Sequence, residues 1–143
     1  MNKFIGAVAA SLGGVEGAAL VPDANPKCTD LQHFAEVSKD MAVLYLIDLA
    51  ASVELENDKQ NADLKQQWKT ANLNYRQRSK QVYAEFVGCS RPEFDALLAS
   101  LPDSDLTTQE IAEATSLWKA CLGVASENVG PWRFDQEGRF YKK

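Results

Sequence analysis

The chain has 143 residues, of which 45% are hydrophobic and 24% charged, and its formal net charge is −5. A chain of this size can bury roughly 70% of its unfolded surface, so one domain with an ordinary core is expected. The acidic balance argues against a dedicated nucleic-acid-binding protein, because contacts with phosphates need a basic surface. We therefore expect protein partners and no nucleic acid.

Residues 1–27 form a Gly/Ala-rich segment followed by a linker that contains Pro22 and Pro26. An apolar run from Phe4 to Val15, followed by the small residues 17–19, resembles a secretory signal with cleavage after Ala19. The same segment is also suited to an N-terminal helix that packs on the domain or contacts a membrane surface through residues 4–21. A membrane-spanning helix is a third interpretation, and all three stay open at this point.

The most apolar helical stretch covers residues 29–55. Thr29 and Gln32 fit a capping box, which predicts that the helix begins there. From Met41 to Val53 apolar residues surround the helix axis, so this part is expected to be buried on all sides. At about 1.5 Å per residue it is only about 20 Å long, too short for a hydrocarbon layer of about 30 Å. A core or contact helix is therefore predicted.

A second helix is predicted over residues 57–87, opened by the cap-like pair Asn57 and Gln60 and followed by Gly88. Its apolar residues recur at spacings of three and four, as in a coiled-coil seam. The remaining faces carry basic side chains at Lys59, Lys65, Lys69, Arg76 and Lys80. This basic face is either solvated or binds an acidic partner protein, and in the second case Lys65, Lys69 and Arg76 are the candidate binding residues.

Two further helices are predicted over residues 90–101 and 107–129. Each opens with a capping box, in which a Ser or Thr is followed three residues later by Glu. The pairs are Ser90 with Glu93 and Thr107 with Glu110. Together the patterns predict an all-α fold, in which residues 28–130 form an antiparallel bundle of four main helices.

Residues 131–143 form a separate aromatic and basic tail, expected to be irregular as an extended strap or to form a tight hairpin. Pro131 prevents continuation of the helix. The aromatic residues of the tail are Trp132, Phe134, Phe140 and Tyr141. They either fold back onto the bundle or anchor in a groove of a partner, where aromatic residues often supply much of the binding energy. They are the second set of candidate partner-binding residues.

The three cysteines, Cys28, Cys89 and Cys121, have no paired spacing typical of a metal site. They are expected to be small buried hydrophobic residues, and a single disulfide is the alternative. The only histidine, His33, is expected to be a partly exposed helix residue. A zinc site built from these four residues is not expected, because the ligand spacing is wrong.

The sequence contains no glycine-rich phosphate loop, no His-Glu metal motif and no nucleophile elbow. We therefore expect no catalytic residues, no cofactor and no enzymatic activity. Asp48, the one charge inside the apolar run, is expected to form a hydrogen bond with Ser52 or with another helix rather than to act in catalysis.

Three functions are compatible with these patterns. The first is a structural or accessory subunit of a larger assembly, such as a virion component or a subunit of a membrane complex. The second is a regulatory or adaptor protein that binds an acidic partner through the basic face of the 57–87 helix. The third is an exported periplasmic helical protein with an N-terminal signal. The sequence leaves the localisation open.

Overall fold

The computed structural model describes residues 24–143, and the N-terminal helix expected before this range lies outside the described residues. The described chain is mostly helical, which confirms the all-α class, and it also contains one small two-stranded sheet. The helices are α1 (Leu31–Asn57), α2 (Ala62–Glu85), α3 (Arg91–Ser100) and α4 (Thr108–Ser126). Short 3₁₀ helices lie at Pro26–Thr29 and Leu101–Asp103, and the strands are β1 (Trp132–Phe134) and β2 (Phe140–Lys142).

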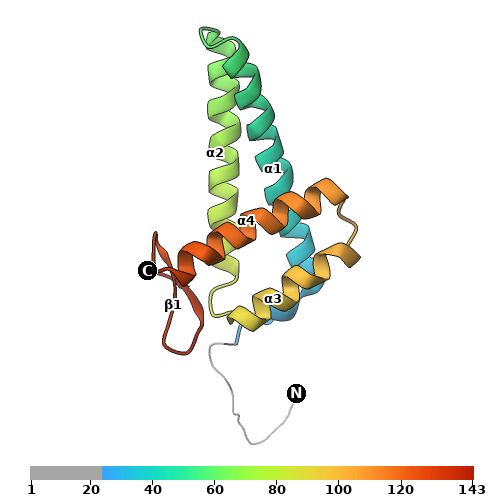
Figure 1. The fold of residues 1–143 in the computed structure, drawn as a ribbon, viewed down its shortest axis with the longest axis vertical. Coiled ribbons are helices and arrows are strands. Elements are labelled where there is room, and N and C mark those ends of the chain that lie inside the picture. Colours follow the sequence, from blue (N-terminus) through green and yellow to red (C-terminus); the bar gives the residue numbers. More distant parts are fainter. Residues whose placement is uncertain (1–23) are drawn as a thin grey trace, which may run out of the picture.

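Helices α1 and α2 lie side by side and are joined by the short link 58–61 (Figure 1). Contacts between them occur in opposite order along the two helices. Arg78 of α2 pairs with Asp40 of α1 at 3.0 Å, whereas the earlier Asn72 contacts the later Asp48. The pair therefore forms a helical hairpin.

The predicted starts of α1 and α2 were wrong by a few residues. The N-cap of α1 is Asp30, whose carboxylate accepts from the backbone N–H of His33 at 3.0 Å, while Thr29 belongs to the preceding 3₁₀ turn. Asp is a better N-cap than Thr, so it takes this position when both are available. Helix α2 is capped by Asn61 rather than Asn57, because Asn57 completes the last turn of α1.

The starts of α3 and α4 are confirmed. Ser90 and Glu93 form a complete capping box at α3, and Thr107 and Glu110 form one at α4. In each, the hydroxyl accepts from the N–H of the glutamate, and the glutamate side chain accepts from the N–H of the capping residue. These bonds lie within four residues of chain, so the local sequence is sufficient to specify them.

The core lies where α3 and α4 pack against the inner half of the helical hairpin. Trp118 of α4 is fully buried and lies at the centre of an aromatic cluster. Its ring centroid lies 4.9 Å from Phe34, 5.3 Å from Phe86 and 5.7 Å from Phe94. Its indole nitrogen donates to the hydroxyl of buried Ser38 at 3.0 Å, so the one polar group of the indole is satisfied.

The C-terminal tail is a β-hairpin, so the expectation of an irregular tail was wrong and the hairpin alternative was correct. Strands β1 and β2 pair antiparallel. Phe140 also extends this pairing to the link before α3: its N–H donates to the carbonyl of Cys89, and its carbonyl accepts from Gly88. In the turn, Asp135 accepts from the N–H groups of residues 137 and 139, and Gly138 adopts a φ of 75° that favours glycine.

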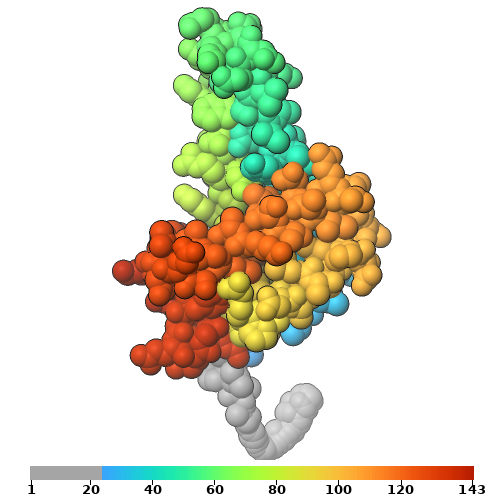
Figure 2. Space-filling model, in the orientation of Figure 1, coloured from blue at the N-terminus to red at the C-terminus, as the bar shows by residue number. Residues whose placement is uncertain are grey.

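The far part of the helical hairpin extends beyond the rest of the domain. We call residues 46–74 the outer hairpin; it is coloured teal to green in Figure 2 and projects away from α3, α4 and the β-hairpin. These later elements contact the inner half of α1 and α2, so each helix of the outer hairpin is covered on one side only. This arrangement creates the main candidate interaction surfaces.

Candidate interaction surfaces

The outer hairpin is joined along its inside by polar and aromatic contacts. Asn72 donates from its side-chain nitrogen to Oδ2 of Asp48 at 3.0 Å, and Asp48 is the only charged side chain buried within residues 24–143. The rings of Tyr45 and Tyr75 meet edge to face with centroids 5.4 Å apart. Asp48 therefore bonds to another helix, as one alternative predicted, whereas Ser52 donates to the carbonyl of Leu49.

The outward side of α1 is apolar and exposed. Ile47, Leu49 and Val53 are 51%, 44% and 54% exposed, and Ala50 lies between them. At about 100° per residue, Val53 points to the side of α1 opposite Asp48, away from α2, whereas Ile47 and Ala50 also border a groove shared with α2. We call these four residues the α1 apolar face. The expected burial of residues 41–53 on all sides was therefore wrong. Helix α2 covers one side of this stretch, and α4 crosses α1 closer to the N-terminal end of α1, so the outward side stays uncovered.

A shallow groove of about 560 Å³ borders this face between the two helices. From α1 it is lined by Ile47, Ala50 and Ala51, and from α2 by residues that include Thr70 and Ala71. Ile47 and Ala50 belong to the α1 apolar face, so this face continues into the groove.

The outward side of α2 is basic. Lys65, Lys69, Arg76 and Lys80 are exposed and form no ion pair with any acid in residues 24–143. Ala71 is buried and borders the groove toward α1, and at about 100° per residue Lys69 and Arg76 point away from it. Leu73, 51% exposed, lies on the same side. We call Lys65, Lys69, Leu73, Arg76 and Lys80 the α2 basic face; it contains the three basic residues proposed from the sequence.

The aromatic residues of the tail separate into buried and exposed members. Trp132 and Phe140 are 6% and 0% exposed, and their rings stack with centroids 4.6 Å apart. Phe134 is half-buried, with the guanidinium of Arg91 over its ring, and Tyr141 is exposed. The burial of Trp132 and Phe140 favours the alternative in which the tail folds back onto the bundle, whereas Phe134 and Tyr141 remain at least partly at the surface.

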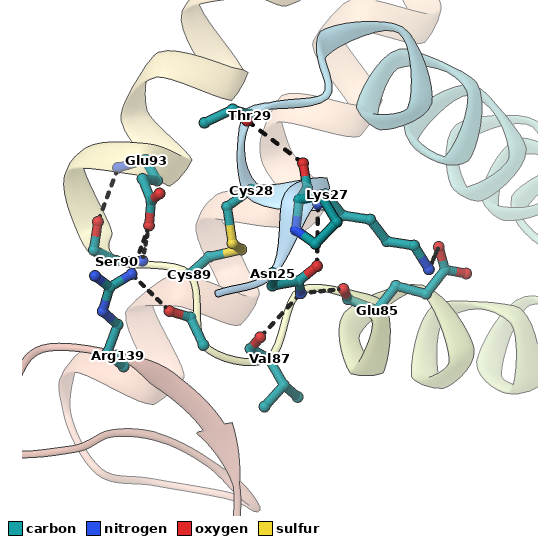
Figure 3. The surroundings of a disulfide bond; sticks show 12 residues. Asn25, Lys27, Cys28, Thr29, Glu85, Val87, Cys89, Ser90, Glu93 and Arg139 are labelled. Atoms are coloured by element: carbon teal, nitrogen blue, oxygen red, sulfur yellow. Dashed lines mark hydrogen bonds and ion pairs between the residues drawn. A yellow bond between two sulfur atoms is a disulfide. The ribbon is translucent and has the colours of Figure 1, made fainter. Parts of the chain in front are cut away.

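A disulfide joins Cys28 to Cys89, across 61 residues of sequence (Figure 3). The expectation that all three cysteines are free was therefore wrong, and the disulfide alternative was correct. Beside this bond, the side-chain nitrogen of Asn25 donates to the carbonyls of Glu85 and Val87, at 2.8 and 3.0 Å (Figure 3). The residues that precede α1 are thus attached to the end of α2.

Glu85 joins a second set of contacts near the disulfide. Its Oε1 lies 2.5 Å from Nε2 of His33 and 3.4 Å from Nζ of Lys27. Partial burial alone raises the pKa of this carboxyl, but the hydrogen bond from His33 and the charge of Lys27 outweigh burial and lower it. Glu85 therefore favours its ionised form, and His33 is partly exposed as expected.

Cys121 is free and buried in α4. Burial raises the pKa of its thiol to about 12, and burial likewise raises the pKa of the neighbouring Tyr83 hydroxyl. A thiol that stays protonated is a poor nucleophile. Cys121 therefore behaves as the small hydrophobic residue expected from the sequence.

Within residues 24–143, no group of three or more His, Cys, Asp or Glu side chains is placed to bind a metal ion. Among the same residues, no helix combines the length and the apolar character needed to cross a membrane. Comparison of the chain with protein-family models, with curated proteins and with solved structures finds no match.

Proposed function

We propose that the protein is a non-enzymatic structural or accessory subunit of a larger assembly, which it joins through the outer hairpin. The observation that carries this proposal is the exposure of Ile47, Leu49 and Val53 by about half on a projecting element (Figure 2). A contiguous apolar patch on a soluble domain is typical of a protein contact. A virion component and an accessory subunit of a membrane complex are both compatible with it.

The energetics favour an interface at this position. Full burial of an aliphatic side chain contributes roughly 1.5 to 3 kcal/mol relative to full exposure. Three such side chains, each about half exposed, leave a few kcal/mol to be gained when a partner covers them. The Asp48–Asn72 hydrogen bond and the Tyr45–Tyr75 contact stabilise the hairpin from inside, so docking does not require it to rearrange.

The proposal includes the antiparallel arrangement of the helical bundle that the sequence predicts. The reversed order of contacts between α1 and α2, from Asp40 with Arg78 to Asp48 with Asn72, supports it for the first two helices. Contact of residues 4–21 with a membrane surface would add a second attachment, in keeping with an accessory subunit.

The test is the size of the native complex in extracts of the source cells, measured by gel filtration and detection of the protein. We expect wild-type protein to elute in an assembly much larger than a monomer, and Val53→Lys to elute as free protein. Val129→Lys is the matched control, because Val129 is also exposed but lies after α4. A monomeric wild-type protein, or equal effects of the two substitutions, would contradict the proposal.

The disulfide favours a second proposal, that the protein is exported. Disulfides persist in oxidising compartments such as the periplasm and are rare in the cytosol. The Cys28–Cys89 bond thus supports the signal-like character of the N-terminal sequence. The intact mass of the native protein should correspond to a chain that begins after Ala19 and is oxidised at one cysteine pair. A native chain that retains residue 1 and has three free thiols would exclude export.

A further inference from the structure

We propose that the partner of the α1 apolar face is a second copy of the same chain, whose α2 basic face lies on it. This inference rests on the proposed function and identifies the neighbour in the assembly. The resulting contact is head-to-tail: each copy uses α1 to bind one neighbour and α2 to bind another.

The α1 apolar face lies at the level of Lys65, Lys69 and Leu73 of the α2 basic face. The contacts of Asp48 with Asn72 and of Tyr45 with Tyr75 set the alignment of the two helices. Leu73 follows Asn72 directly, so along the hairpin it lies level with Ile47, although on the opposite side. Two outer hairpins placed side by side would therefore bring the two faces together along their projecting parts.

The charges of the two helices are complementary. Between residues 41 and 57, α1 contains three acidic residues and no basic one. Asp48 is buried toward α2, whereas Glu54 and Glu56 are exposed beside the apolar face, and Glu56 also pairs with Lys59 at 3.1 Å. Between residues 64 and 84, α2 contains five basic residues and no acidic one. Attraction between such surfaces speeds and orients association, and like charges oppose a contact between two α2 helices or two α1 helices. The pairing of α1 with α2 is thus the favoured combination between copies.

Apolar contact is also available from the α2 side. Leu73 is 51% exposed in the middle of the α2 basic face. The neighbouring Lys69 and Arg76 have long aliphatic stems that can cover apolar surface while their charged ends remain in water. Leu73 can therefore pack on Ala50 and Val53 of the second copy while the basic groups reach Glu54.

The geometry excludes a closed symmetric pair for this contact. Val53 of the α1 apolar face points away from α2, and Leu73 of the α2 basic face points away from α1, so these two contact residues lie on opposite sides of one hairpin. A single second copy cannot engage both. Such a heterologous contact repeats from copy to copy, and it produces a ring or a filament rather than a two-fold dimer.

The experiment uses purified wild-type protein and two variants, Val53→Lys on α1 and Leu73→Lys on α2, in sedimentation velocity over a concentration series. For the wild type we expect the mass to rise with concentration past that of a dimer. Each variant alone should remain a monomer, because each has lost one face. An equimolar mixture should form a dimer and stop there, since the intact α2 of one variant binds the intact α1 of the other. Restored binding also shows that both variants are folded.

Charge-reversal variants test separately whether electrostatic attraction between the α2 basic face and α1 drives the association. Lys69→Glu combined with Arg76→Glu should abolish the rise in mass, and added salt should weaken wild-type association. Lys119→Glu combined with Lys142→Glu makes the same charge change on exposed residues outside both faces and should leave the association unchanged.

Three results would overturn the inference: a wild-type protein that is monomeric throughout, a Leu73→Lys variant that still assembles like the wild type, or a mixture of variants that remains monomeric. The outcome is separable from that of the proposed function. Purified wild type could be monomeric while Val53→Lys, in cell extracts, is no longer part of the large complex. In that case the subunit role stands and the neighbour is a different protein.

Discussion

Asn72 of α2 donates a hydrogen bond at 3.0 Å to the carboxylate of Asp48, which is buried in the most apolar part of α1. The outer hairpin is thus joined by a polar contact at the level where the apolar side chains of α1 point outward. A helix whose inner side carries Asp48 and whose outer side carries Ile47, Leu49 and Val53 has the reverse of the usual arrangement of an isolated surface helix. That reversal is the reason to expect a partner on α1.

Substitution of Asn72 tests how much its hydrogen bond to Asp48 contributes to stability. Asn72→Ala removes a donor and leaves the buried carboxylate of Asp48 with one hydrogen bond fewer, which should lower the free energy of unfolding by about 1 to 3 kcal/mol. Asn74→Ala, an exposed position on the same helix, should change it by less than about 0.5 kcal/mol. Urea unfolding followed by circular dichroism measures both. Equal losses would show that the bond to Asp48 does not contribute.

Phe140 and Tyr141, adjacent in β2, allow a matched comparison of a buried and an exposed aromatic residue of the tail. Phe140 is fully buried against Trp132 and Phe94, and Phe140→Ala should cost about 3 to 5 kcal/mol of stability. Tyr141→Ala removes an exposed aromatic residue from the adjacent position and should cost under about 1 kcal/mol. Thermal unfolding distinguishes these values. Similar small effects would mean that the hairpin leaves the core readily, and that Trp132 and Phe140 are available to a partner after all.

Loss of the disulfide should destabilise the whole domain. Cys28 and Cys89 are 61 residues apart in sequence, and closing a loop of that length stabilises the fold by about 4 kcal/mol in the chain-entropy treatment. We expect Cys28→Ser combined with Cys89→Ser, and wild type with reductant, to lose stability by similar amounts. Reductant added to the double variant is the control and should have no further effect. An oxidised and a reduced wild type of equal stability would contradict this prediction.

The contacts of Glu85 predict a dependence of stability on pH. The pKa of Glu85 is lowered in the folded state, so its ionised form contributes stability that is complete above the ordinary carboxyl pKa and disappears as the pH falls through the lowered value. At neutral pH, Glu85→Gln should be less stable than wild type by about 1 kcal/mol. This difference should vanish in acid.

The measurement is the free energy of unfolding of both proteins across a pH series, with Glu127→Gln as the control. Glu127 is exposed at the end of α4, and its substitution should have little effect at any pH. A difference between wild type and Glu85→Gln that stays constant into acid would show that the His33 and Lys27 contacts do not depend on the charge of Glu85.

The helical character of this chain could be predicted from sequence because its signals are local. The capping boxes of Ser90 with Glu93 and Thr107 with Glu110 form between residues three apart, so no distant contact is needed to specify them. The basic face of α2 could also be predicted from the sequence, since the helical repeat alone places Lys65, Lys69 and Arg76 on one side. Thr29 and Asp30 are adjacent and can both cap a helix. Asp30 is the N-cap in the structure, so α1 begins later than the sequence pattern predicted.

Burial and covalent pairing were decided only by the tertiary structure. Cysteine spacing cannot show that Cys28 and Cys89 meet, because their proximity depends on how the 61 intervening residue positions fold. Phe140 is buried because its backbone pairs with Gly88 and Cys89, a contact between segments far apart in the chain. Hydrophobicity identifies which side chains prefer to leave water, whereas the placement of α3 and α4 determines which of them do. The sequence by itself therefore determined where the helices form, and the three-dimensional packing decided that Trp132 and Phe140 lie inside while Ile47, Leu49 and Val53 remain exposed.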